Sequence, residues 1–248
     1  MIIGSKLYYE DEVDSTNIYA KSLLKTASDG TIVLADLQTA GKGRLDRPWY
    51  SPVGGIWMSV ILKPEKPNLI PVLTSVSLCE TFMTYDILLG LKWPNDVTLN
   101  KKKVAGILCE VVDQSVIVGI GLNLNIKEFP PELRHTATSV FIETKKSFDK
   151  MAVFQMLCKE IDYNYMMLKG DHVSHLLTKW RHYTIMLGKD VMIELPGRKV
   201  TGRVLDISSD GGLVIMKPDN TIERILAGDC QLVSMEKATR DDHAKPGT

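Results

Sequence analysis

The feature that most constrains the fold is a change of pattern at Gly188. After this residue, short apolar and β-branched runs alternate with turns such as Pro196-Gly197. Strands are expected at 191–195, 200–207, 213–216, 222–226 and 231–233. Five short strands joined by tight turns predict a small β-barrel, which divides the chain into a domain at 1–187 and a barrel at 188–235. We expect the polar tail at 236–248 to be disordered.

The segment before the barrel combines strand and helix patterns. Strand-like runs occur at 7–9, 31–36, 56–62, 87–91, 97–99, 104–112 and 116–125. Apolar residues recur with helical spacing at 18–24, 72–85, 147–168 and 171–186. Pro94 predicts a bulge or a sheet edge, and 127–146 is expected to be a long loop that could close over a site. Together these patterns predict an α+β fold in which helices pack on a mixed sheet.

Charge and cysteine content argue against several classes of protein. Lys plus Arg and Asp plus Glu number 30 each, so the overall basic footprint of a nucleic-acid binder is absent. The four cysteines are far apart, which argues against a disulfide framework or a zinc site and fits a reducing cytoplasm. His172 and His175 have a spacing that suits a metal, but without acidic or cysteine neighbours they are expected to be surface histidines. We find no signal peptide and no membrane-spanning run.

A basic, glycine-containing stretch at Gln38 to Ser51 lies between two expected strands. Gly41 and Gly43 allow a backbone to come close to a ligand. Three cations lie within six residues, namely Lys42, Arg44 and Arg47. Asp46 is the one acid that opposes them within the stretch, so the loop is suited to holding phosphates. It matches neither a P-loop nor a dinucleotide fingerprint, and a solvated basic loop is the alternative interpretation.

The expected hairpin at 87–112 carries three charged residues near its ends, namely Lys92, Asp96 and Lys103. Lys103 adjoins a buried strand and is therefore the candidate functional amine. Lys101 and Lys102 lie in the turn and are expected to be solvated.

Two further pairs of residues leave both a structural and a functional interpretation open. Asp14 or Ser15 could cap the helix that follows, while the hydroxyls of Ser15 and Thr16 could instead face a polar ligand. Gly119 and Gly121, two positions apart on one strand, indicate either close packing or room for a ligand on the sheet.

Five motifs in order make the chain resemble the biotin protein ligases. They are Asp14-Ser15-Thr16-Asn17, Gln38 to Ser51, Lys92 to Asp96, Lys103 to Glu110 and Gly119 to Asn125. The resemblance implies a catalytic domain like that of class II aminoacyl-tRNA synthetases, followed by an SH3-like barrel. It also implies an ATP-dependent biotin-[acetyl-CoA-carboxylase] ligase. Such an enzyme converts biotin and ATP to biotinyl-5′-AMP and pyrophosphate, then transfers biotin to one lysine of a biotin carboxyl carrier protein or domain.

The resemblance also implies roles for individual residues. Biotin would be held by Ser15, Thr16, Gln38, Gly41, Lys103 and Gly106. The ATP or adenylate would be held by Lys42, Gly43, Arg44, Arg47, Trp49 and Asn123, with Trp49 packing near adenine and Asn123 hydrogen-bonding it. The catalytic residues would be Lys103, Arg44, Asp96 and Lys92.

The chemistry of adenylate formation agrees with these roles. A carboxylate that attacks the α-phosphorus brings two anions together, so the site needs fixed cations, which Lys103 and Arg44 can supply. The carboxylate needs no strong base, because it is already ionised at neutral pH. In the transfer step the acceptor lysine must lose a proton, and Asp96 is a hypothetical acceptor. Magnesium would arrive with ATP on the phosphate oxygens, so a dedicated protein metal site is not expected.

The chain departs from the family pattern at two places. Many members have Arg at the position of Lys42, so a bidentate phosphate contact becomes a point charge here. Members that also act as repressors carry an N-terminal helix-turn-helix domain, for which the motif starting at Asp14 begins too early. We therefore expect a cytoplasmic, monofunctional enzyme without DNA binding or membrane attachment, and a homodimer is allowed. A lipoate or octanoyl ligase, a non-catalytic biotin sensor and a DNA-binding repressor are the alternatives.

Overall fold

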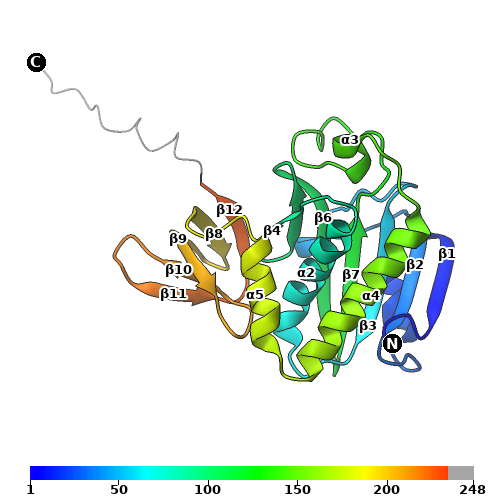
Figure 1. Cartoon of the computed structure of the whole chain (residues 1–248), viewed down its shortest axis with the longest axis horizontal. Helices are drawn as coiled ribbons and strands as arrows, with labels where there is room; N and C mark the ends of the chain where they lie inside the picture. Colours follow the sequence, from blue (N-terminus) through cyan, green and yellow to red (C-terminus); the bar gives the residue numbers. More distant parts are fainter. Residues whose placement is uncertain (234–248) are drawn as a thin grey trace, which may run out of the picture.

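A seven-stranded sheet forms the larger part of the chain in the computed structural model, which describes residues 1–233 (Figure 1). In spatial order its strands are β1 (Leu7–Val13), β2 (Thr31–Gln38), β3 (Ile56–Leu62), β7 (Ser115–Leu122), β6 (Lys102–Val112), β5 (Asp96–Leu99) and β4 (Gly90–Lys92). Strands β1 and β2 are parallel and the other neighbours are antiparallel, which confirms the predicted mixed sheet. The tail predicted at 236–248 lies outside the described residues.

Helices cover the two faces of this sheet unequally. The long helices α2 (Ile70–Met83), α4 (Lys150–Lys169) and α5 (Val173–Tyr183) pack together on one face, and α1 (Thr16–Leu23) contacts β2, β3 and β7. Short 3₁₀ turns occur at η1 (Arg44–Asp46) and η2 (Pro67–Leu69). Helix α5 ends three residues before the predicted end at 186, because the chain becomes extended at Thr184.

The side chains of the central strands alternate between the two faces, as the period of a strand requires. On β3, Met58 and Val60 join the large core with the long helices. Trp57 and Ser59 point to the opposite face, where Trp57 belongs to a separate small cluster. The central strands are therefore buried on both faces, and the face opposite the long helices carries the polar side chains.

The predicted loop at 127–146 is partly helical. It contains α3 (Val140–Thr144), whose first turn is capped by the Ser139 hydroxyl accepting from the backbone N–H of Ile142 at 3.0 Å. The segment before α3 lies along β6, where Lys103 N–H donates to the Thr136 carbonyl at 2.9 Å. Pro94 lies in the turn between the edge strand β4 and β5, and the register of β5 shifts between Val97 and Thr98, so the strand irregularity is not at the predicted residue.

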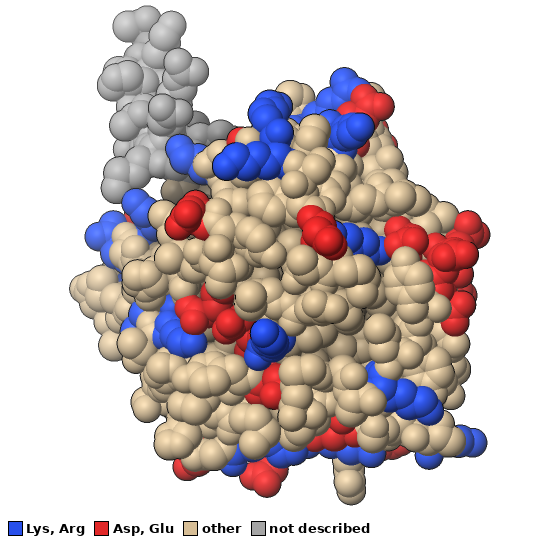
Figure 2. All heavy atoms as spheres, turned by 45° about the vertical axis from the view of Figure 1, so that its right-hand side comes forward, with Lys and Arg blue, Asp and Glu red and all other residues tan. Residues whose placement is uncertain are grey.

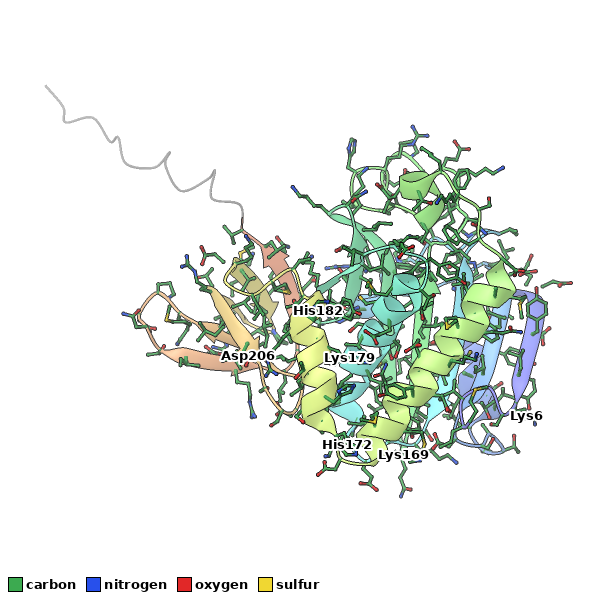
Figure 3. All side chains as sticks on the ribbon, in the orientation of Figure 1. Lys6, Lys169, His172, Lys179, His182 and Asp206 are labelled. Atoms are coloured by element: carbon green, nitrogen blue, oxygen red, sulfur yellow. The ribbon has the colours of Figure 1, made fainter. Side chains whose placement is uncertain are left out.

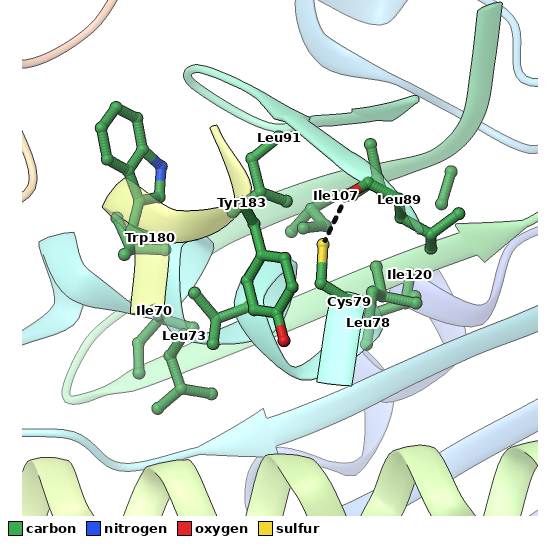
Figure 4. Close-up of a cluster of buried hydrophobic side chains, with 14 of the residues drawn as sticks. Ile70, Leu73, Leu78, Cys79, Leu89, Leu91, Ile107, Ile120, Trp180 and Tyr183 are labelled. Carbon is green, nitrogen blue, oxygen red and sulfur yellow. Dashed lines mark hydrogen bonds between the residues drawn. The ribbon is translucent and has the colours of Figure 1, made fainter. Parts of the chain in front are cut away.

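The core between α2, α5 and the sheet is apolar with few polar groups (Figure 4). The thiol of Cys79 donates to the Leu89 carbonyl at 3.7 Å, and burial raises the pKa of this thiol well above its usual value. Tyr183 donates its hydroxyl to Glu80, which also accepts from Lys179 at 2.7 Å. Burial pushes the pKa of Glu80 upward, but these two donors outweigh it and hold the pKa below its usual range.

The C-terminal sheet is antiparallel throughout. Its strands are β8 (Asp190–Leu195), β9 (Arg198–Ile207), β10 (Leu213–Met216), β11 (Ile222–Ile225) and β12 (Asp229–Leu232), and they lie in the order β11-β10-β9-β8-β12. The last strand begins at Asp229, two residues earlier than predicted. This sheet docks next to β4 and α5, where the Trp93 indole donates to the Gly211 carbonyl at 3.1 Å and Arg181 pairs with Asp206 at 2.7 Å. Its apolar residues belong to the same continuous core as those of the large sheet.

The histidines that suggested a metal site are exposed. His172 and His182 lie at opposite ends of α5 (Figure 3). His175 packs edge-on against the Tyr163 ring. Within residues 1–233, no three metal-ligating side chains gather, and no helix is long and apolar enough to span a membrane. The four cysteines are all free thiols.

Candidate functional site

A cavity of about 340 Å³ opens on the sheet face opposite the long helices. Its walls come from the start of α1, the basic loop, the β4–β5 connection, the segment before α3 and the last barrel strand. All predicted site residues line it except two, Gly41 and Lys92. The structure thus brings together residues from both halves of the chain.

The floor of the cavity includes glycines on two adjacent strands, Gly106 of β6 and Gly119 and Gly121 of β7. Gly119 lies between Ser59 and Leu108 in the sheet, and Gly121 lies between Trp57 and Gly106. A side chain at 119 would collide with the Asn17 carboxamide, and one at 121 would collide with the Trp49 indole. The two glycines are therefore needed for close packing, and the packed side chains themselves face the cavity.

The polar end of the cavity lies at the start of α1. Ser15 is at the N-cap position, but neither it nor Asp14 makes a side-chain cap bond to α1 within the described residues. The Thr16 N–H and hydroxyl both donate to Gln38 Oε1, at 2.9 and 3.1 Å, and the Ser59 hydroxyl donates to Thr16 Oγ1 at 2.7 Å. The structural interpretation of these hydroxyls as caps is wrong among the described residues, because the Thr16 hydroxyl belongs to this network and Ser15 lines the cavity without capping α1.

The other end of Gln38 is tied to the start of the basic loop. Its Nε2 donates to Ser51 Oγ at 2.9 Å, and Ser51 donates to the Trp49 carbonyl at 3.0 Å. A Cβ at Gly41 would lie 2.6 Å from Ser51 Oγ, so Gly41 is a buried packing position beneath this bond. That explains why it lies behind the cavity wall.

The cations of the basic loop are each held by an oxygen. Lys42 lies 3.5 Å from Asp46, and Arg44 donates to the Asn95 side chain at 3.2 Å. Arg47 pairs with Asp229 of β12 at 2.7 Å. Asp46 is the one acid within the sequence stretch, but it is not the one acid near these cations in the fold. Asp229 of the C-terminal sheet supplies a second carboxylate.

The three charged side chains of the expected hairpin lie together in the structure. Lys103 Nζ lies 2.5 Å from Asp96 Oδ1 and 5.0 Å from the centre of the Trp49 ring. Lys92 Nζ approaches the other oxygen of Asp96 at 3.9 Å, from behind the cavity wall. The Lys103 stem and the Trp49 ring both lie over Gly106, where a Cβ would be only 3.0 Å from each. Lys103 thus lines the cavity beside Asp96 and beside Trp49 of the basic loop.

Two buried polar atoms in the cavity wall have no hydrogen-bond partner among the described residues. They are the indole nitrogen of Trp49 and the side-chain oxygen of Asn123, whose Nδ2 donates to the Thr138 carbonyl at 2.9 Å. An unpaired buried polar group costs free energy of about 1–3 kcal/mol. One donor and one acceptor in the same wall are suited to hydrogen-bonding a planar polar ring.

Several wall residues were not predicted as site residues. Asp229 and Cys230 come from the barrel, and Phe129 and Leu133 come from the segment before α3. No local sequence pattern indicates that these residues belong to the site, since they reach the cavity through the packing of distant segments. Burial raises the pKa of the Cys230 thiol to about 12, so this thiol is uncharged at neutral pH.

Comparison with known proteins agrees with this architecture. Residues 9–126 match the model of the biotin/lipoate A/B protein ligase family, and residues 186–233 match that of the biotin protein ligase C-terminal domain. The bifunctional ligase/repressor BirA of Bacillus subtilis is 35% identical over 93% of this chain and 75% of its own length. The biotin–[acetyl-CoA-carboxylase] ligase of Mycobacterium tuberculosis is 30% identical over 88% of this chain and 85% of its own.

A solved structure shows the same arrangement. The biotin protein ligase from Aquifex aeolicus, in complex with biotin and ATP, superposes with a TM-score of 0.83 at 35% identity. The match covers 92% of this chain and 99% of that one.

Proposed function

The chain belongs to the biotin protein ligases, and from this premise we propose a role for each part of the cavity. The enzyme is an ATP-dependent biotin–[acetyl-CoA-carboxylase] ligase with a catalytic mixed sheet and an SH3-like C-terminal domain. The observation that supports the assignment of roles best is that one cavity brings Lys103 together with a neutral polar pocket and a loop with three cations.

The polar end would bind the biotin ring system. Ser15, Thr16 and Gln38 offer hydroxyl and amide groups there, while the packed glycines beneath leave the pocket narrow. Biotin is uncharged at its ring system and ionised at its carboxylate, so neutral hydrogen-bonding groups suit the ring and a cation suits the other end. Gly41 would contribute indirectly, by allowing Ser51 and Gln38 to approach.

The basic end would bind the adenylate. Trp49 and Asn123 would face adenine, because their unpaired indole N–H and carboxamide oxygen match a ring with both an acceptor and a donor. Arg44, Arg47 and Lys42 would surround the phosphates together with the backbone at Gly43. Magnesium would accompany ATP on its phosphate oxygens, near the two carboxylates that line the cavity, Asp96 and Asp229.

Lys103 would serve the first chemical step. A fixed ammonium between the biotin carboxylate and the α-phosphate offsets their repulsion and the charge that develops as the new bond forms. Asp96 holds this ammonium at 2.5 Å, and Lys92 approaches the same carboxylate from outside. In the transfer step Asp96 would accept the proton of the incoming lysine, which requires that it first release one of its two lysine partners.

We also propose the setting of the reaction. The partner is a biotin carboxyl carrier protein or domain, and use of ATP together with four free thiols supports the cytoplasm. Basic and acidic side chains are mixed on the face shown in Figure 2, which gives no support for a DNA-binding surface there. A homodimer is compatible with this proposal.

The decisive experiment supplies purified protein with ATP, magnesium and biotin, and follows pyrophosphate release together with the mass of the acid-extracted product. Biotinyl-5′-AMP is expected, and addition of a carrier domain should convert it to a protein-bound biotin and AMP. Octanoate and lipoate serve as matched alternative acids. Faster adenylation of either acid than of biotin would contradict the proposed role of the polar end.

A further inference from the structure

Behind the polar end of the cavity, a chain of hydrogen bonds runs outward to the protein surface. The Ser59 hydroxyl lies 2.6 Å from Asn17 Oδ1 and 2.7 Å from Thr16 Oγ1, and it is entirely buried. The Asn17 Nδ2 donates to Glu110 Oε2 at 2.7 Å, and Glu110 Oε1 accepts from Lys21 at 2.6 Å. The family assignment gives no function to these outer residues.

The orientation of the Asn17 carboxamide is fixed by Glu110. An ionised carboxylate only accepts hydrogen bonds, so Asn17 must turn its NH₂ toward Glu110. Its oxygen then faces Ser59 and can only accept. A rotation of the carboxamide by half a turn would place two oxygens against each other at 2.7 Å, which is repulsive.

The orientation of Gln38 is fixed in the same way from the other side. The backbone N–H of Thr16 only donates, so Gln38 Oε1 must face it, and the Thr16 hydroxyl proton also goes to this oxygen. Thr16 therefore has no second proton to give to Ser59.

The consequence is that the network is one proton short. Ser59 has a single hydroxyl hydrogen but faces two acceptors, Asn17 Oδ1 and Thr16 Oγ1. One of these two oxygens is always left without a full hydrogen bond. Both Asn17 and Thr16 line the cavity, while Ser59 does not, so the missing donor can be supplied only from the cavity side.

We propose that Glu110 is a positioning residue that makes this pocket selective for a ring N–H. By holding the Asn17 oxygen toward Ser59, it keeps the acceptor at Thr16 available for a donor of the ligand. This inference rests on the proposed role of the polar end in binding the biotin ring, whose ureido nitrogens carry such hydrogens. A ligand with an oxygen in place of the ring N–H would not supply the missing hydrogen, and its oxygen would repel the oxygen of Thr16.

The test compares biotin with its cyclic carbamate analogue, in which one ring N–H is replaced by oxygen, by calorimetric titration of the intact protein. The measured quantity is the ratio of the two dissociation constants. In Glu110→Ala the Asn17 carboxamide is free to rotate, its NH₂ can donate to Ser59, and Ser59 can then donate fully to Thr16. We expect the preference for biotin over the carbamate to fall by about tenfold, the equivalent of one hydrogen bond.

Three matched variants separate this role from a general structural one. Glu110→Gln retains an oxygen for Asn17 and should keep the wild-type ratio, and Lys21→Met should keep it as well. Ser59→Ala removes the shared proton but leaves both acceptors, so its ratio should equal or exceed that of the wild type. A Glu110→Ala protein with the wild-type ratio would overturn the inference, as would an equal loss in Glu110→Gln or a loss in Ser59→Ala. Failure of the wild type to bind biotin would instead overturn the proposed function.

Discussion

The two ends of the cavity differ in how their side chains are held and in how exposed they are. The polar end rests on strands and the first turn of α1, with Thr16 only 3% exposed and Ser59 at 0%. The basic end is a loop whose cations are largely in solvent, with 63% of the Arg47 side chain and 49% of the Lys42 side chain exposed. One end is thus held by buried hydrogen bonds, and the other by the surface ion pairs of Lys42 and Arg47 and the half-buried hydrogen bond from Arg44 to Asn95.

This difference agrees with the ligands proposed for the two ends. Buried hydrogen bonds with fixed direction distinguish ligands of similar size, because a wrong partner leaves a polar group unpaired. Exposed ion pairs contribute only about 0–1 kcal/mol, so a phosphate can replace Asp46 or Asp229 at little cost. Under the proposed roles, the ring would be selected by a preformed pocket, whereas the phosphates would be received by cations that can change partners.

The largest expected effect concerns the residue where the two ends meet. Under its proposed role, Lys103→Ala would remove a fixed cation at the reacting phosphate, and adenylate formation should fall by on the order of 10²- to 10³-fold. Pyrophosphate release from biotin and ATP reports the rate. The control is Lys102→Ala, one residue earlier on β6, where the ammonium donates to the Arg134 carbonyl. A folded Lys103→Ala protein with a rate near that of the wild type would remove Lys103 from the mechanism.

A smaller effect should separate the two ends through their glycines. In Gly119→Ala the new methyl group collides with Asn17, and in Gly121→Ala it collides with Trp49. Overpacking of this kind costs about 1–3 kcal/mol, so we expect changes on the order of tenfold. Gly119→Ala should raise the KM for biotin and Gly121→Ala the KM for ATP.

Each glycine variant is the matched control for the other, since the two positions are on the same strand and the same face. Steady-state kinetics with one substrate varied at a time gives both constants. If both variants raised the same KM, the division of the cavity into two ends would be incorrect.

The arrangement of helices and strands could be predicted from the sequence, because it depends on local patterns. Strand alternation and helical spacing are local, so the sheet, the long helices and the barrel follow from them. The meeting of Lys92, Asp96 and Lys103 was also predictable, because a hairpin brings its ends together.

The interactions that were missed depend on the docking of distant segments. Arg47 and Asp229 are 182 positions apart, and their pairing requires the barrel to be placed against the basic loop. Likewise, Asn17 and Glu110 lie in separate motifs, and only the fold shows that one fixes the orientation of the other. No local pattern carries such information.

The smallest expected effect tests whether the ion pairs of the basic loop are replaceable. Asp229→Ala frees Arg47 but leaves the Lys42 and Arg44 contacts, so the loop of the ligand-free protein should open more often. An exposed pair stabilises by about 0.2–1 kcal/mol, which corresponds to an increase of up to about fivefold in tryptic cleavage after Lys42 and Arg44. Cleavage after Arg47 should stay slow, because Pro48 follows it.

The decisive comparison in this experiment is between cleavage with and without ligands. Biotin plus ATP should suppress both cuts in the wild type and in Asp229→Ala alike, because the bound phosphate then takes the place of the missing carboxylate. Asp219→Ala, which alters an exposed barrel carboxylate near Lys217, is the control and should leave cleavage unchanged. Equal cleavage with and without ligands would mean that the loop does not close on the adenylate. The basic end would then be as fixed as the polar end, and the roles of Arg44 and Arg47 would have to be reassigned.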